Sequence, residues 1–375
     1  MAGDSDPSPG RSGQTHQIGS ARRPSPIAGG RCAARLRFGH TLRIADAARG
    51  LARRAALPAH HSDIARDHLR QRSFRSWLPR GVRAATPRRF RRYVRTLRAK
   101  RRIVATYGGF RRSPRPALRY VLFDRELDNF TYEIANVDAL VHFIADVLTV
   151  DDRIVRRYVD ELASDRALEA VLRDRLDGRP DRNRTMPFGR RLGWYAIVRL
   201  CRPRLIVETG VHDGLGSTAL LRALERNHTE EAYGRLVSID IRPDVGWLIP
   251  DHLRVRHSLV LGDSLTALAR AADSRPVDMF IHDSDHRYAH EFAEYEAIAD
   301  RIRPGGVILS DNSHAGSALV DFCEDRGLAF HYWSEVPQAH FYPGAGVGMT
   351  VVGNDWLPSD RARRTVASTY RARIG

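Results

Sequence analysis

The sequence has 375 residues and is 42% hydrophobic, which is enough for a sizeable core in one large domain with extensions or in two domains. It contains no apolar run of about 18 residues and no apolar stretch near its start, so we predict neither a membrane span nor a secretory signal and expect a cytoplasmic protein. The three cysteines, Cys32, Cys201 and Cys323, are far apart, which argues against a disulfide framework and against a zinc site.

The formal net charge of +17 is concentrated in the first part of the chain. Residues 1–115 contain 28 Lys and Arg against 5 Asp and Glu, whereas residues 116–375 contain 33 against 39. The main part of the chain is therefore mildly acidic, and we expect no specific nucleic-acid partner. Lys100 is the only lysine, a bias that we attribute to the codon usage of a GC-rich genome.

Residues 1–85 are rich in Arg, Ala, Pro, Gly and Ser and show weak periodicity, which predicts a disordered tail. Residues 86–115 contain a helical pattern, with apolar side chains spaced three and four apart and arginines on the other faces. The apolar positions are Phe90, Tyr93, Val94 and Leu97. This basic amphipathic helix either contacts an anionic surface, such as lipid or an acidic partner, or lies on its own protein.

Residues 116–186 show mainly helical patterns, and we interpret them as a helical cap that carries no chemistry. In residues 187–357 short β-branched runs alternate with helical segments, which is typical of a sheet covered by helices on both faces. We therefore predict an α/β fold with a doubly wound, seven-stranded, mostly parallel sheet, followed by a C-terminal tail at 358–375. The predicted strands are 205–209, 236–240, 258–263, 278–283, 306–311, 329–333 and 348–353.

The first predicted strand leads directly into a glycine-rich turn, ETGVHDGLGST, and then into a helix. Glycines allow the backbone to turn tightly and to approach a ligand, and the start of a helix offers free N–H groups to an anion. The spacing of Gly210, Gly214 and Gly216 differs from the dinucleotide pattern GxGxxG. The turn therefore indicates a nucleotide-type ligand other than NAD, although many α/β proteins use such turns for packing alone.

These features resemble class I S-adenosylmethionine-dependent methyltransferases, and more narrowly the small-molecule O-methyltransferases whose loop has the pattern E-x-G-x-x-x-G. The resemblance covers residues 187–353 and implies a Rossmann-like methyltransferase fold and S-adenosylmethionine as cofactor. Glu208, Gly210 and Gly214 match the loop. Ser217 lies one place after the usual serine, where this chain has Gly216, so either position could face the cofactor carboxylate.

Two further acidic residues match cofactor-binding positions of the same family. Asp240 closes the second predicted strand, where the resemblance implies a carboxylate that accepts hydrogen bonds from both ribose hydroxyls. Asp263 closes the third, at the position near the adenine ring. Acidic residues that close three successive strands favour a cofactor site over chance placement.

The stretch FIHDSDHRY follows the fourth predicted strand, and DN follows the fifth. In the fold that the resemblance implies, these two strands are neighbours, so Asp283, Asp311 and Asn312 should meet at the carboxyl edge of the sheet. Catechol-type and macrolide-sugar-type O-methyltransferases bind a divalent metal at these positions, and oxygen ligands suit Mg²⁺. Asp283 and His286 are the candidate catalytic residues, with His286 as general base. Asp285 or His286 could instead cap the next helix.

The resulting hypothesis is methyl transfer from S-adenosylmethionine to a hydroxyl of a small molecule, such as a sugar or secondary metabolite, assisted by Mg²⁺ or another divalent cation. A homodimer is one option for its assembly. The alternative is a catalytically silent cofactor-binding module whose basic N-terminal region binds nucleic acid or membrane. The Pro-Pro-aromatic string of amine and nucleobase methyltransferases is missing after the fourth strand, which disfavours nucleic-acid methylation.

Overall fold

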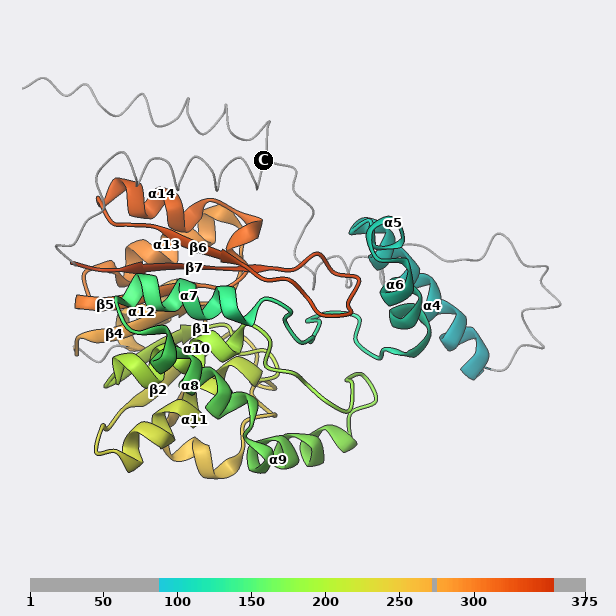
Figure 1. Cartoon of the computed structure of the whole chain (residues 1–375), viewed down its shortest axis with the longest axis horizontal. Helices are drawn as coiled ribbons and strands as arrows, with labels where there is room; N and C mark the ends of the chain where they lie inside the picture. The colour runs from blue at the N-terminus through green and yellow to red at the C-terminus, as the bar shows by residue number, and fades with distance from the viewer. Residues whose placement is uncertain (1–87, 272–274, 354–375) are drawn as a thin grey trace, which may run out of the picture. The chain divides into compact units, whose positions relative to one another are not determined.

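Seven strands form one sheet in the computed structural model of the chain, which describes residues 88–271 and 275–353 (Figure 1). The predicted tails at 1–85 and 358–375 lie outside the described residues. Each strand lies within a few residues of its predicted position. They are β1 (Leu205–Thr209), β2 (Arg235–Asp240), β3 (His257–Leu261), β4 (Val277–His282), β5 (Ile302–Ser310), β6 (His331–Ser334) and β7 (Gly346–Val351).

The strand order is β3-β2-β1-β4-β5-β7-β6. Strands β1 to β5 are parallel to one another, whereas β7 is antiparallel to both β5 and β6. The predicted seven-stranded, mostly parallel sheet is therefore confirmed. In this register Thr209 lies opposite Ile239 on one side and His282 on the other, so the carboxyl ends of β1, β2 and β4 meet at one edge.

Apolar side chains cover both faces of the sheet, because strands that are buried on both sides consist of almost continuous apolar runs. Ile206, Met279 and Ile281 belong to the core on one face, and Val207 and Phe280 to the core on the other. The first face is covered by α7 (Val137–Leu148), α8 (Asp152–Ala163), α9 (Arg166–Asp177), α10 (Arg191–Cys201) and α11 (Leu215–Thr229). The second is covered by α12 (Ser264–Ala271), α13 (Tyr288–Ala299) and α14 (Ala318–Asp325).

The predicted basic helix is α4 (Arg88–Thr106), which is followed by α5 (Gly109–Arg112) and α6 (Pro114–Phe123). Val104 and Tyr120 from these helices share an apolar cluster with Phe130 and Phe341. The C-terminal part of α4 is thus engaged with its own chain, whereas Tyr93 of the predicted apolar face is 54% exposed. The arginines of α4 from residue 92 onward are exposed. Among residues 88–271 and 275–353, no helix is long and apolar enough to cross a membrane.

Two helices from the predicted cap share one core with the sheet. Leu140 and Ile144 of α7 and Val155 of α8 are almost fully buried in the cluster that also contains Ile206 of β1. This part of residues 116–186 therefore contributes to the stability of the cofactor-binding region.

We expect Ile144→Ala to lower the free energy of unfolding of the whole domain by about 2–5 kcal/mol, because it opens a cavity at a fully buried position. Val171→Ala on α9, where 37% of the side chain is exposed, is the control and should change stability by about 0.5 kcal/mol or less. Urea denaturation measures both. If Ile144→Ala produced a separate early transition and left the main one unchanged, α7 would be an independent unit.

Candidate cofactor and acceptor site

The loop after β1 packs directly against the end of β4. Gly210 has a φ of 84°, and a Cβ atom at this position would lie 2.0 Å from the backbone oxygen of Asp283. Gly214, with a φ of 94°, is the N-cap of α11. Only glycine adopts these conformations without strain, so the two predicted loop glycines hold the loop close to β4 and start the helix.

Asp240, at the end of β2, also holds the loop. One carboxylate oxygen accepts a hydrogen bond of 2.9 Å from the backbone N–H of Val211, and the other accepts one of 2.9 Å from Arg242. A carboxylate has room for further donors, so Asp240 can accept ligand hydroxyls at the same time.

Glu208 lies beneath the loop and is almost completely buried. Burial raises the pKa of Glu208 to about 7, although hydrogen bonds from the hydroxyls of Ser217 at 2.6 Å and Ser238 at 2.7 Å oppose the effect. Ser217 thus points to Glu208, and it is Gly216 that lines the pocket. A Cβ atom at residue 216 would lie 2.7 Å from the Trp194 ring, so glycine allows the helix start to pack closely against Trp194.

A pocket of about 520 Å³ lies at this edge of the sheet. Among the predicted site residues, its lining includes Glu208, Gly210, Asp240, Asp263, Asp283, Asp311 and Asn312. Gly214, Ser217 and His286 are not among the lining residues. The pocket is also lined by residues outside the predicted motifs, which are Phe130, Tyr132, Arg190, Arg191 and Tyr342.

The two predicted acids at the ends of β4 and β5 differ in their partners. Both oxygens of Asp311 accept hydrogen bonds from Arg190, one through Nε and the other through Nη2 at 2.5 Å. Burial alone would raise the pKa of Asp311, but the Arg190 guanidinium outweighs it and holds that pKa below its usual range. Burial and the neighbouring Asp311 carboxylate raise the pKa of Asp283 well above its usual range.

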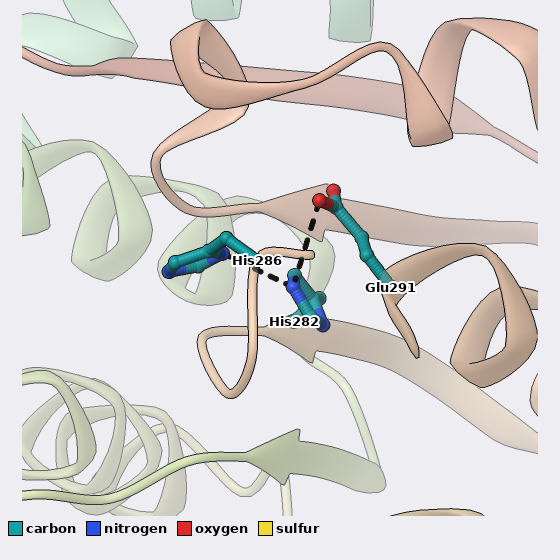
Figure 2. A group of neighbouring side chains, drawn as sticks. All are labelled: His282, His286 and Glu291. Carbon is teal, nitrogen blue, oxygen red and sulfur yellow. Dashed lines mark hydrogen bonds and ion pairs between the residues drawn. The ribbon is translucent and has the colours of Figure 1, made fainter. Parts of the chain in front are cut away.

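His286 lies behind Asp283 and Asn312, at one end of a buried polar network. Its Nε2 atom is 3.0 Å from the Asn312 amide nitrogen and 3.7 Å from Asp283 Oδ1. Its Nδ1 atom is 3.1 Å from Nε2 of His282, which lies between His286 and Glu291 in Figure 2. On its other side His282 contacts Glu294 at 2.7 Å. Hydrogen bonds therefore account for this cluster without an ion.

Asp285 lies in the turn before α13 but does not cap that helix, whose N-cap is Arg287 without a side-chain cap hydrogen bond. Its Oδ1 accepts a hydrogen bond of 3.1 Å from the backbone N–H of Arg287, at the start of α13, and its carboxylate also contacts the Arg287 side chain. Asp285 therefore shapes the turn into α13.

Sequence reasoning missed Arg190 and Arg191, which stand at the start of α10 and far from the motifs. Both side chains are buried, and Nε of Arg191 has no hydrogen-bond partner within the described part of the chain. This Nε atom lies 3.6 Å from the point where a Cβ atom of residue 216 would be. A buried guanidinium above a helix start forms a site for an anion. In a chain with so many arginines, no sequence signal distinguishes these two.

Residues 207–313 match the family model described as a methyltransferase domain. The matched segment runs from β1 to the loop after β5 and contains the glycine-rich loop and the acidic ends of β2, β4 and β5. The predicted resemblance to class I methyltransferases is confirmed. This part of the chain is therefore similar to methyltransferase domains.

Several solved structures are similar to the chain. The O-methyltransferase TomG from Streptomyces achromogenes, in complex with S-adenosylmethionine, is 22% identical, with a TM-score of 0.38 over 51% of this chain and 91% of TomG. A putative O-methyltransferase from Klebsiella pneumoniae is 17% identical, with a TM-score of 0.39 over 58% of this chain and 97% of the other. A comparison with curated proteins finds no match. Because these TM-scores are low, the assignment rests on the family match and on the site.

We expect Gly210→Ala to abolish cofactor binding, because the new Cβ atom would collide with the backbone of Asp283 and push the loop away from β4. Titration calorimetry with S-adenosylhomocysteine measures the effect. Gly178→Ala is the control, since a Cβ atom there meets nothing within 4 Å. Unchanged affinity in Gly210→Ala would show that the loop does not contact the cofactor.

Proposed function

We propose that this chain transfers the methyl group of S-adenosylmethionine to a hydroxyl of a small molecule. The proposal rests on one observation, which is that a single pocket has two chemically different halves. One half has the acidic ends of β1, β2 and β3, which suit a nucleoside. The other has Asp283, Asn312 and three aromatic side chains, which suit a hydroxylated acceptor with an apolar body.

In the cofactor half, Asp240 accepts hydrogen bonds from the ribose hydroxyls and Asp263 lies beside the adenine ring. Glu208 faces the positively charged end of the cofactor, and a cation there stabilises its ionised form. Ser217 supports Glu208 from behind, and Gly210 and Gly214 shape the loop.

Arg191 binds the cofactor carboxylate in this arrangement. Its buried guanidinium and the start of α11 both favour a negative group above Gly216. The position that holds a serine in the resembling family is thus a glycine here, and an arginine from another helix supplies the donor.

In the acceptor half, Asp283 takes the proton of the acceptor hydroxyl while its oxygen attacks the methyl group. The C–S bond of the sulfonium breaks as the new C–O bond forms, and the cofactor leaves as a neutral thioether. A positive sulfonium beside Asp283 favours its ionised form, which is the form that accepts the proton. His286, 3.7 Å from Asp283 and outside the pocket lining, acts only indirectly, as a neighbour that positions the Asp283 carboxylate.

The divalent ion expected from the sequence does not fit this arrangement. Arg190 is paired with both oxygens of Asp311 and places a fixed positive charge where the ion would bind, so a divalent cation there would be repelled. The mechanism above therefore uses side chains alone. The cytoplasmic location, the homodimer and the contact of residues 86–115 with anionic surfaces stay predictions.

We expect Asp240→Asn to weaken S-adenosylhomocysteine binding by about 10- to 150-fold, because each hydrogen bond to a charged group contributes about 1.5–3 kcal/mol. Asp244→Asn is the matched control, since Asp244 pairs with Arg242 at the surface after the same strand. Calorimetric titration gives both affinities. The cofactor assignment would be wrong if wild-type protein bound neither S-adenosylmethionine nor its product.

We expect Asp283→Asn to lower kcat by about 10²–10⁴ because it removes a general base. Its affinity for S-adenosylhomocysteine should stay unchanged, because this product carries no sulfonium. The assay follows S-adenosylhomocysteine formation with an acceptor found by screening hydroxylated small molecules. Asp285→Asn is the control, since Asp285 is engaged with Arg287. Normal turnover by Asp283→Asn would exclude Asp283 as the base.

A further inference from the structure

Arg190 lies at the two strand ends where the sequence predicts a divalent metal. Its Nε and Nη2 atoms contact the two oxygens of Asp311, and its Nη1 atom is 3.5 Å from Glu335 Oε1. Each nitrogen of the guanidinium thus faces an acidic oxygen. The pairing with Asp311 is bidentate, which is the geometry in which arginine binds carboxylates most strongly.

The surroundings of Arg190 hold it in this position. Glu335, its second partner, also accepts hydrogen bonds from the Tyr132 hydroxyl and, at 2.6 Å, from the backbone N–H of Ala345. Arg190 is 7% exposed and Asp311 and Glu335 are each 1% exposed. The guanidinium cannot turn away without leaving two buried carboxylates without a counter-charge, which is strongly unfavourable.

Distance alone would allow a metal here. Asp283, His286 and Asp311 each offer a ligand atom, and these atoms lie within 4.8 Å of one another. The pairing of Asp311 with Arg190 argues against a metal at this position. Each oxygen of Asp311 keeps a second lone pair, but Arg190 lies against both oxygens and does not lose its proton. A divalent ion on this carboxylate would therefore face a fixed positive charge at close range, which opposes its binding.

We propose that Arg190 is the permanent counter-cation of this site, that it takes the place of a divalent metal, and that methyl transfer by this chain needs no metal ion. The inference rests on the proposed function, because it concerns the same pocket. It also specifies the acceptor. A metal selects molecules with two adjacent oxygens that complete its coordination shell, whereas this site requires one hydroxyl.

The test measures metal binding, so that it does not depend on an identified acceptor. The full chain is freed of metals with EDTA, saturated with S-adenosylhomocysteine and titrated with Mn²⁺, and free Mn²⁺ is followed by electron paramagnetic resonance. We expect no stoichiometric Mn²⁺ site in the wild type. In Arg190→Gln, which frees Asp311 and removes one positive charge, we expect Mn²⁺ to bind about tenfold more tightly or better.

Arg191→Gln is the matched control, because it removes the neighbouring positive charge but leaves the Asp311 carboxylate engaged. It should acquire no stoichiometric Mn²⁺ site, while its affinity for S-adenosylhomocysteine falls. Adding Asp283→Asn to Arg190→Gln should remove the new site. A melting curve shows whether Arg190→Gln folds. If it does not fold, the wild-type Mn²⁺ titration alone tests the inference, through the presence or absence of a stoichiometric site.

A stoichiometric Mn²⁺ site in the wild type that Asp283→Asn removes would overturn the inference. A folded Arg190→Gln variant with no gain in Mn²⁺ affinity would also overturn it, because Arg190 would then not be what excludes the metal. Failure of the proposed function looks different, since the wild type would then not bind S-adenosylhomocysteine at all.

Discussion

Five parallel strands end in acidic residues at one edge of the sheet, and the rest of the site depends on how this negative charge is compensated. Glu208, Asp240, Asp263, Asp283 and Asp311 all line one pocket. Glu208 and Asp311 are almost completely buried, and Asp283 adjoins Asp311, so these three carboxylates cannot all stay ionised without cations. Burial raises the pKa of Glu208 to about 7 and that of Asp283 well above its usual range, which shows how strongly the edge resists further negative charge.

In the proposed function, two arginines and the cofactor balance the negative charge of these acids. Arg190 neutralises Asp311, and Arg191 lies near the helix start where an anion is expected. The charge that remains on Glu208 and Asp283 suits a ligand with a positive centre, and S-adenosylmethionine has a sulfonium and an ammonium group. In the proposed function, the same acids that make the edge unfavourable when empty favour a cationic ligand.

Much of the fold could be predicted, because its signals are local. The strands are β-branched runs of near-continuous apolar residues, and their ends are marked by the acids and glycines of the motifs. The proximity of Asp283 and Asp311 also followed, since the order of strands in the resembling family makes β4 and β5 neighbours. The direction of individual side chains was harder to predict than the positions of the strands. Ser217 turns to Glu208, and a one-residue difference on a helix changes the direction of a side chain by about 100°.

The sequence by itself therefore determined the α/β class, the strand positions and the set of acidic residues at the cofactor edge, because these depend on neighbouring residues and on a short motif. Only the tertiary structure decided how those acids are paired. Arg190 is 121 residues from Asp311 along the chain, and nothing in its local sequence distinguishes it from the other arginines. The packing of α10 against the sheet brings its guanidinium to the carboxylate, and this contact determines which cation the site holds.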